Sequence, residues 1–377
     1  MKNILFAICI LLLNSCTVIK QLSSEKIITK IQCSNLTINN KSVLLEVEID
    51  GSKSDFLFDT GSTYSTLLDS TIINGFENKK FGFFGSAKGA DNKKIKNRFF
   101  TANLKTNLFE SENKVLTFIN FPKSKCITKK KYTGIIGFDV FFADKSSVKI
   151  DFSNNSICNI NASQMQVFLD KNKYNLIKSK CSNNQVSIFL TIEDKEYKFK
   201  VDTGYMGNII IPFNSELFLK NYNKIELEGA AYQTVAGATF GYEDYYEKIP
   251  VRIGDRSVFS KISVSTTIKA QNIGIEFIKG FDWIIDYNNN KVYIKPNQNI
   301  IAFQFARNVT YYCKANYDNK LLISVKEKSQ TTYSIGDEII SVNGKLVSLE
   351  NICEMQDLLN NTEDWNNLKL EVIPVKN

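Results

Sequence analysis

Two segments of the chain repeat the same alternation of apolar and polar residues. They are Val43–Asp59 (VLLEVEIDGSKSDFLFD) and Val186–Asp202 (VSIFLTIEDKEYKFKVD), equal in length and separated by a constant offset of 143 residues. Each alternates with period two, meets a short polar cluster, and alternates again, which predicts a β-hairpin. Both hairpins therefore deliver an aspartate at the end of their second strand.

The repetition continues downstream with small changes in length. Ile135-Ile136-Gly137 is matched by Ile273-Gly274, and Val148–Asn155 is matched by Trp283–Asn290 as a strand that enters a polar turn. Internal repeats of this length indicate duplicated lobes, whereas a solenoid needs more copies at a shorter period. We expect a mainly β protein with two homologous lobes, at residues 37–165 and 166–300.

The pattern changes after Pro296. Tyr333–Gly344 (YSIGDEIISVNG) has a turn followed by a strand, Leu349–Asn360 is amphipathic at helical spacing, and Leu368–Val375 alternates like a closing strand. Residues 301–377 are therefore expected to form a third, small α+β domain.

The N-terminus has the features of an export signal. Lys2 is followed by an uncharged apolar stretch, Ile4–Leu13, which is too short to span a bilayer stably. Leu13-Asn14-Ser15-Cys16 resembles the cleavage site of a bacterial lipoprotein, with residues 1–15 as the signal peptide and Cys16 as the lipidated residue. A cleaved signal with an incidental cysteine is the alternative. Residues 16–36 would be a linker, and the lipid would anchor the chain to a membrane in the cell envelope, on its periplasmic or cell-surface side.

Composition narrows the chemistry. The 377 residues are 43% apolar and 23% charged, as expected for globular domains, and they contain no histidine. This excludes Ser-His-Asp and Cys-His catalysis and histidine-bound zinc. The net charge of +8, or +7 without Lys2, is scattered and lacks a nucleic-acid-binding motif. No cofactor is indicated. Outside the signal and Cys16, six cysteines allow fifteen disulfide connectivities: Cys33, Cys126, Cys158, Cys181, Cys313 and Cys353.

The repeated aspartates suggest a reaction. Each opens the tripeptide Asp-Thr-Gly, at Asp59 and at Asp202, after an equivalent strand. If the lobes face each other about a pseudo-twofold axis, equivalent loops meet on that axis. Two adjacent carboxylates cannot both ionise easily, so they share a proton. One can then take a proton from water while the other donates to a carbonyl oxygen.

These loops, each followed by an apolar-apolar-glycine element, resemble the active-site loops of pepsin-type and retropepsin-type aspartic proteases. The whole arrangement is similar to bacterial aspartyl protease family proteins, with two retropepsin-like β-barrel lobes and a PDZ-like domain. The resemblance implies a membrane-anchored aspartic endopeptidase that acts on extended polypeptide, with no metal. It implies the following roles: catalytic Asp59 and Asp202; loop support from Thr60, Gly61, Ser62, Thr203 and Gly204; and packing beneath the loops by Ile136, Gly137, Ile273 and Gly274.

The resemblance also implies a flap, a hairpin that closes over the bound peptide. Two glycine-rich segments are candidates, Gly82–Gly89 around Gly85 and Ser86, and Thr234–Gly241 around Ala236 and Gly237. A substrate strand beneath such a hairpin would gain main-chain hydrogen bonds and place alternate side chains in pockets.

Two departures from the family pattern leave alternatives open. Ser62 can offer its hydroxyl to the first aspartate, whereas Tyr205 occupies the equivalent position in the second loop. A non-catalytic, peptide-binding surface lipoprotein is therefore the main alternative, and a carboxylate-held metal hydrolase is a weaker one. The segment Leu321–Ser334 is short for a PDZ domain, so this domain is either a peptide-binding module or a structural cap.

Overall fold

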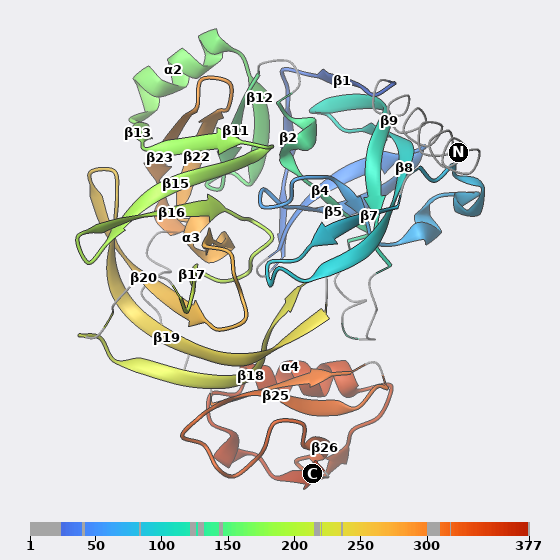
Figure 1. The fold of residues 1–377 in the computed structure, drawn as a ribbon, viewed down its shortest axis with the longest axis vertical. Coiled ribbons are helices and arrows are strands. Elements are labelled where there is room, and N and C mark those ends of the chain that lie inside the picture. Colours follow the sequence, from blue (N-terminus) through green and yellow to red (C-terminus); the bar gives the residue numbers. More distant parts are fainter. Residues whose placement is uncertain are drawn as a thin grey trace, which may run out of the picture.

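The computed structural model describes residues 24–39, 42–82, 84–120, 126, 132–142, 146–214, 219, 221–234, 237–299, 310–316 and 318–375. The expected signal peptide and Cys16 lie outside these residues. Within them the chain is mainly β, as predicted, and its strands form three sheets (Figure 1).

The first sheet comes from the N-terminal part of the chain. An extra pairing between β8 and β9 brings the sheet back on itself, so that six of its strands form a closed circuit. Its strands are β1 (Lys26–Thr29), β3 (Thr37–Asn39), β4 (Ser42–Ile49), β5 (Ser52–Phe58), β6 (Thr66–Leu67), β7 (Phe84–Lys88), β8 (Lys94–Lys105), β9 (Phe109–Phe118) and β10 (Gly134–Ile136).

A second sheet repeats this layout and continues into the C-terminal domain. An extra pairing between β15 and β19 closes an equivalent circuit. Its strands are β14 (Ser179–Ser182), β15 (Gln185–Ile192), β16 (Lys195–Val201), β17 (Ile209–Pro212), β18 (Lys224–Thr234), β19 (Gly237–Ile253), β20 (Arg256–Ser265), β21 (Asn272–Ile273), β24 (Tyr311–Ala315), β25 (Leu321–Glu327), β26 (Glu338–Val342), β27 (Lys345–Leu346) and β28 (Leu370–Ile373).

The equivalence of the two circuits is visible strand by strand. The hairpins β4–β5 and β15–β16 both turn through two consecutive residues with positive φ, Asp50 and Gly51 in one and Glu193 and Asp194 in the other. Such turns match the twist of a hairpin. Strand β5 runs parallel to β10, and β16 runs parallel to β21. The two circuits therefore share the same order of strand pairing.

The third sheet joins the two lobes. Three strands from each half lie in the order β13-β23-β22-β11-β12-β2, and β11 meets β22 antiparallel at the centre. The order of the strands is therefore equivalent when it is read outward from β11 and from β22. The strands are β2 (Cys33–Asn35), β11 (Ser147–Asp151), β12 (Ser156–Ile160), β13 (Asn175–Ile177), β22 (Phe281–Asp286) and β23 (Lys291–Pro296).

Two expected boundaries differ from the structure. Part of the expected linker, residues 16–36, forms β1 and β2, which pair with β9 and β12. The expected division after residue 165 falls inside helix α2 (Ala162–Asn172), which begins with a capping box at Asn161. Paired main-chain groups fix the two strands in place, although their short sequences show little alternation.

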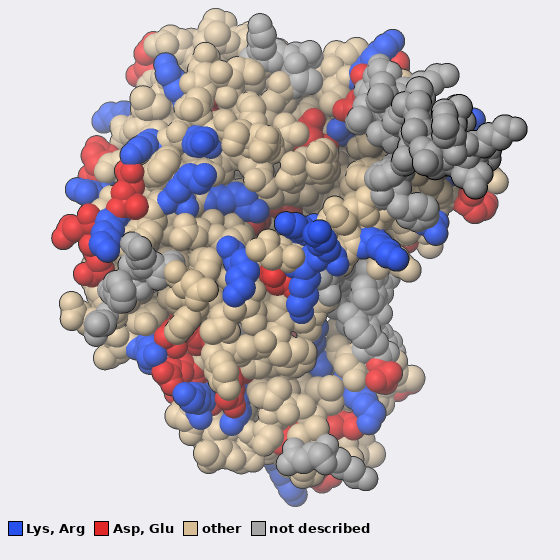
Figure 2. Space-filling model, viewed as in Figure 1, with Lys and Arg blue, Asp and Glu red and all other residues tan. Residues whose placement is uncertain are grey.

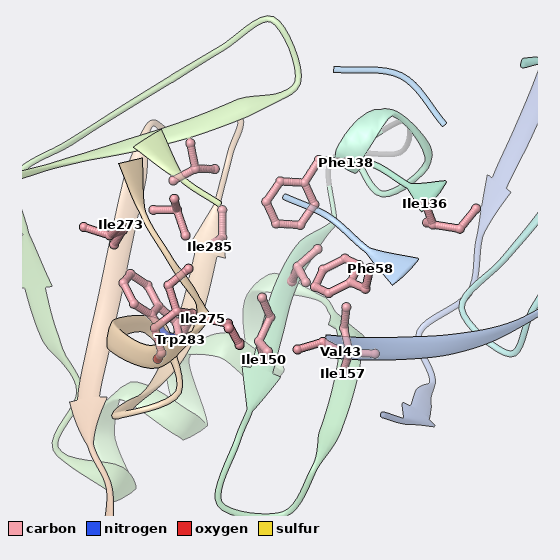
Figure 3. Close-up of a cluster of buried hydrophobic side chains, with 14 of the residues drawn as sticks. Val43, Phe58, Ile136, Phe138, Ile150, Ile157, Ile273, Ile275, Trp283 and Ile285 are labelled. Atoms are coloured by element: carbon pink, nitrogen blue, oxygen red, sulfur yellow. Dashed lines mark hydrogen bonds between the residues drawn. The ribbon is translucent and has the colours of Figure 1, made fainter. Parts of the chain in front are cut away.

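One hydrophobic core runs through both lobes and beneath the two loops of interest. Figure 3 shows Phe58 and Ile136 on one side and Ile273 and Trp283 on the other, with Ile150 of the shared sheet nearby. Phe58 and Val201, each next to an aspartate, are both buried in this core. Close packing of this kind resists displacement, so the core holds the starts of both loops in place.

The C-terminal domain has a separate core and includes helix α4 (Ile352–Asn361). Its strand β25 pairs antiparallel with β18, and the disulfide Cys126–Cys353 ties the domain to the first lobe. A second disulfide, Cys33–Cys158, crosses from β2 to β12. Cys181 and Cys313 are free.

Candidate active site

Two equivalent loops start where β5 and β16 end. The backbone N–H of Asp59 donates to Ile136 O at 2.9 Å, and that of Asp202 donates to Ile273 O at 3.0 Å. Gly274 lies directly beneath the second loop, because a Cβ on it would be 2.3 Å from Gly207 O. A Cβ on Gly137 would be 2.7 Å from Ser62 O in the first loop.

The loops are cross-linked by their threonines. Thr60 Oγ1 donates to Val201 O at 2.8 Å and accepts from the N–H of Thr203 at 3.1 Å. In return, Thr203 Oγ1 donates to Phe58 O at 2.6 Å and accepts from the N–H of Thr60 at 3.0 Å. Both threonines are fully or almost fully buried. The four reciprocal bonds fix the distance between residues that are 143 positions apart.

Each glycine lies against the carboxylate of the opposite loop. A Cβ on Gly61 would be 2.3 Å from Asp202 Cγ, and one on Gly204 would be 2.4 Å from Asp59 Oδ2. Only a residue without a side chain permits this approach. Burial, followed by the charge of Asp202, raises the pKa of Asp59 to about 7, while Lys200 acts in the opposite direction. The two carboxyl groups therefore lie side by side and interact strongly.

The residues three positions after each aspartate, Ser62 and Tyr205, do not use their side chains as expected. The N–H groups of Gly61 and Ser62 donate to Asp59 Oδ1 at 2.8 and 3.1 Å, but the Ser62 hydroxyl donates to Tyr64 O. The expected bond from that hydroxyl to the aspartate is therefore absent. In the second loop, the N–H of Tyr205 donates to Asp202 Oδ1 at 3.1 Å. Main-chain donors thus support both carboxylates, whatever the side chain.

The Tyr205 phenol points away from the aspartates into a buried polar group. Its ring centroid is 6.2 Å from that of Tyr232, whose hydroxyl donates to buried Glu243. Burial raises the pKa of the Tyr205 phenol and also that of the Glu243 carboxyl. The Tyr205 phenol is therefore neutral, and Tyr205 links the second loop to strands β18 and β19.

Two polar residues beside Asp202 were not anticipated from the sequence. Asn272 Nδ2 donates to Asp202 Oδ2 at 2.6 Å, and Lys200 Nζ lies 3.6 Å from the same oxygen. The repeat offset aligns Lys200 with Leu57 of the first lobe. A lysine at a position that is apolar in the other copy was the signal that could have revealed this site.

The hairpin tips lie partly elsewhere than expected. Gly85 and Ser86 belong to β7, and the chain turns between β7 and β8 at residues 89–93, because Gly89 and Lys93 close the turn. In the second lobe, Thr234 and Gly237 close the β18–β19 turn, with Gly237 at φ 109°. Ala236 lies outside the described residues.

The two tips lie next to each other. A Cβ on Gly89 would be 3.1 Å from Thr234 Oγ1, and the N–H of Lys269 in the second lobe donates to Ala90 O at 2.9 Å. Figure 2 shows the face of the molecule that is also turned toward the viewer in Figure 1. Lys and Arg side chains lie across the middle of this face, from the region of β15 and β16 to that of β7. Exposed lysines of the first hairpin are Lys88, Lys93, Lys94 and Lys96.

In the C-terminal domain, one edge of β24 is already hydrogen bonded. Asn360 Oδ1 of helix α4 accepts from the N–H of Cys313 at 2.9 Å, and Asn360 Nδ2 donates to Cys313 O at 2.9 Å. Gln356 Oε1 accepts from the N–H of Ala315 at 2.8 Å. A peptide strand added at this edge would have to displace both helix side chains.

Within the described ranges, no group of three or more His, Cys, Asp or Glu side chains is arranged to hold a metal ion. A search of the same residues for a helix long and apolar enough to cross a membrane finds none. Comparison with models of protein families gives no match, and no curated protein matches the sequence.

Proposed function

We propose that the chain is an aspartic endopeptidase that hydrolyses extended polypeptide segments. The observation that carries this proposal is the pair of Asp-Thr-Gly loops, cross-linked by four reciprocal hydrogen bonds, with each glycine against the opposite carboxylate. Two closed strand circuits with the same order of strand pairing support lobes of the retropepsin type. The small domain after them, with its strands and helix α4, supports the PDZ-like comparison.

The arrangement suits general acid-base hydrolysis. Below about pH 7, Asp59 carries a proton because its pKa is about 7, and in this proposal Asp202 acts as the acceptor. Asp202 takes a proton from a water molecule as its oxygen attacks the peptide carbonyl carbon, and Asp59 protonates the carbonyl oxygen. Asp202 then passes its proton to the amide nitrogen, the C–N bond breaks, and Asp59 regains a proton from the tetrahedral hydroxyl group.

The substrate would lie between the aspartate loops and the paired hairpin tips. Backbone groups of an extended segment can hydrogen bond to such hairpins, so a loop or unfolded stretch of protein fits best. Exposed lysines on the first hairpin favour segments with acidic side chains. The two disulfides support the proposal of export to the cell envelope, where such bonds persist, with Cys16 as the lipid anchor.

The test is single substitution of Asp59→Asn and Asp202→Asn in the purified chain, assayed on a peptide library from pH 3 to 8. Both variants should lose activity by at least about 1,000-fold, with chelator having no effect. Asp194→Asn is the matched control, since this exposed turn residue has φ 60° and asparagine tolerates that conformation.

The outcomes separate the alternatives. Wild-type protein that binds peptides without cleaving them over this pH range would favour the peptide-binding lipoprotein. Cleavage abolished by chelator would favour the metal hydrolase. Cleavage that survives either aspartate substitution would refute the shared-proton mechanism.

A further inference from the structure

The second aspartate has polar neighbours where the first has apolar ones. In the second lobe, Lys200 is the register partner of Asn272 between β16 and β21. In the first lobe, Leu57 is the register partner of Ile135 between β5 and β10. Leu57 and Ile135 belong to a small buried apolar cluster with Leu44. The four residues therefore occupy equivalent backbone positions, and their side chains are apolar in the first lobe and polar in the second.

Both second-lobe side chains stabilise negative charge on Asp202. Asn272 is buried, and its Nδ2 makes the 2.6 Å bond to Asp202 Oδ2. Its Oδ1 is buried and has no hydrogen-bond partner among the described residues. A buried acceptor without a partner lowers the free energy of unfolding. The bond to Asp202 is therefore the hydrogen bond that the buried Asn272 side chain makes at this site.

Lys200 connects the two loops. Its Nζ donates to Gly61 O of the first loop at 3.1 Å and lies 3.6 Å from Asp202 Oδ2. Gln185 Nε2 donates to the same carbonyl oxygen at 2.9 Å. The ammonium group is thus held on the second-lobe side of the carboxylate pair, with its side chain 24% exposed.

The charged and titratable groups around the pair come from both lobes. Asp59 follows β5 and Asp202 follows β16. Lys200 lies in β16, and Tyr132 precedes β10. Burial, with a smaller effect from the charge of Asp59, raises the pKa of the Tyr132 phenol, so this group is neutral. Lys200 is the cation of this group: its Nζ lies 3.6 Å from Asp202 Oδ2, and its charge also lowers the pKa of Asp59.

We propose that Lys200 and Asn272 are positioning residues that hold Asp202 as the ionised carboxylate, which leaves the shared proton on Asp59. The inference deepens the proposed function, on which its catalytic consequence rests. It assigns the base to the second lobe and the acid to the first, although Asp59 Oδ1 accepts from two main-chain N–H groups of its loop and Asp202 Oδ1 accepts from one.

The test uses Lys200→Leu and Asn272→Ile, which place in the second lobe the residues found at the equivalent positions of the first lobe. Without the cation both protons of the pair are held more tightly, so the bell-shaped pH dependence of kcat/KM should move to higher pH by about one unit or more in Lys200→Leu. Activity on the acidic side of the profile should fall, with little change in KM. Asn272→Ile should move the profile in the same direction.

Two further variants are the controls. Lys200→Arg should restore the profile, because it restores the positive charge. Lys198→Leu removes an exposed lysine from the same strand and should leave the profile unchanged. If Lys200→Leu does not fold, Lys200→Met replaces it, since methionine keeps an unbranched chain of similar length.

A second measurement does not require activity. Carbon-13 NMR of labelled aspartate carboxyl groups gives the titration of the resting protein, with Asp59→Asn and Asp202→Asn for assignment. We expect Asp202 to ionise first in the wild type and at higher pH in Lys200→Leu. Unchanged titration in Lys200→Leu, or earlier ionisation of Asp59, would overturn the inference. The expected titration in a protein that cleaves no peptide would refute the proposed function alone.

Discussion

The two aspartate loops share one backbone design and differ in the side chains around it. Both aspartates receive a main-chain bond from their own loop, and both threonines make the same pair of bonds to the opposite loop. Lys200 and Asn272 lie beside Asp202, whereas the equivalent positions of the first lobe hold Leu57 and Ile135. The two loops therefore share their geometry and differ in the side chains beside each carboxyl group.

The threonine cross-links are the most symmetric part of the comparison, and breaking them should have the largest effect. Thr60→Val and Thr203→Val each remove two hydrogen bonds and leave a buried N–H and a buried carbonyl without partners. Each should lower the free energy of unfolding by about 3–4 kcal/mol, and by similar amounts. Urea denaturation measures this, with Thr60→Ser and Thr203→Ser as hydroxyl-retaining controls. A large difference between the two valine variants would contradict equal roles.

The shared sheet breaks the symmetry through a covalent bond. Cys33 and Cys158 are register partners and form a disulfide, whereas Leu176 and Tyr293 are the register partners on the other side. Replacing both cysteines by alanine should cost about 3 kcal/mol of unfolding free energy. Leu176→Ala should cost less than about 1 kcal/mol, because Leu176 is 56% exposed. Equal costs for the two sides would contradict this assignment.

The glycines test how closely the loops must approach. Gly61→Ala and Gly204→Ala each place a methyl group against the opposite carboxylate, and a displacement of about 1 Å should lower kcat/KM about 100-fold. The effect should be similar in both variants. Gly51→Ala is the control, since a Cβ there has no neighbour within 4 Å and only its φ of 85° is unfavourable. That control should lose some stability and keep its activity per folded molecule.

Per pH unit, the pH dependence of stability is the smallest expected effect. The pKa of Asp59 rises from 3.8 to about 7 on folding, so the folded protein binds this proton more tightly than the unfolded chain. The contribution of Asp59 to the free energy of unfolding should therefore fall as the pH rises from about 4 to about 7, by no more than about 1.4 kcal/mol per pH unit. Unfolding measured across this range should show a shallower slope in Asp59→Asn. An unchanged slope would mean that Asp59 is not the group with the raised pKa.

Much of the fold could be predicted because the chain carries two copies of one pattern. Alternation and the constant offset located the hairpins that end at Asp59 and Asp202, and helical spacing located α4 at Ile352–Asn361. The shared sheet was less accessible, since β11 and β22 read as buried strands without revealing which strand each would pair with. Register between distant strands depends on tertiary packing and not on local pattern.

The site was predictable only in part for a related reason. The tripeptides identified the loops, but the partner of each hydroxyl is a matter of rotamer and neighbouring backbone. Ser62 therefore bonds to Tyr64 O, and the Tyr205 phenol lies near Tyr232. Asn272 lies 70 residues from the aspartate that it supports. No spacing rule connects two residues that far apart.

The pairing between β18 and β25 determines what is exposed when the C-terminal domain is removed. Leu227, Glu228 and Gly229 pair there with Glu327, Lys326 and Val325 of the last domain, respectively. A chain ended before residue 310 would leave these main-chain groups of the hairpin arm open to other molecules. Exposed edge strands promote self-association, so a chain of the two lobes alone should aggregate more readily than the full-length protein.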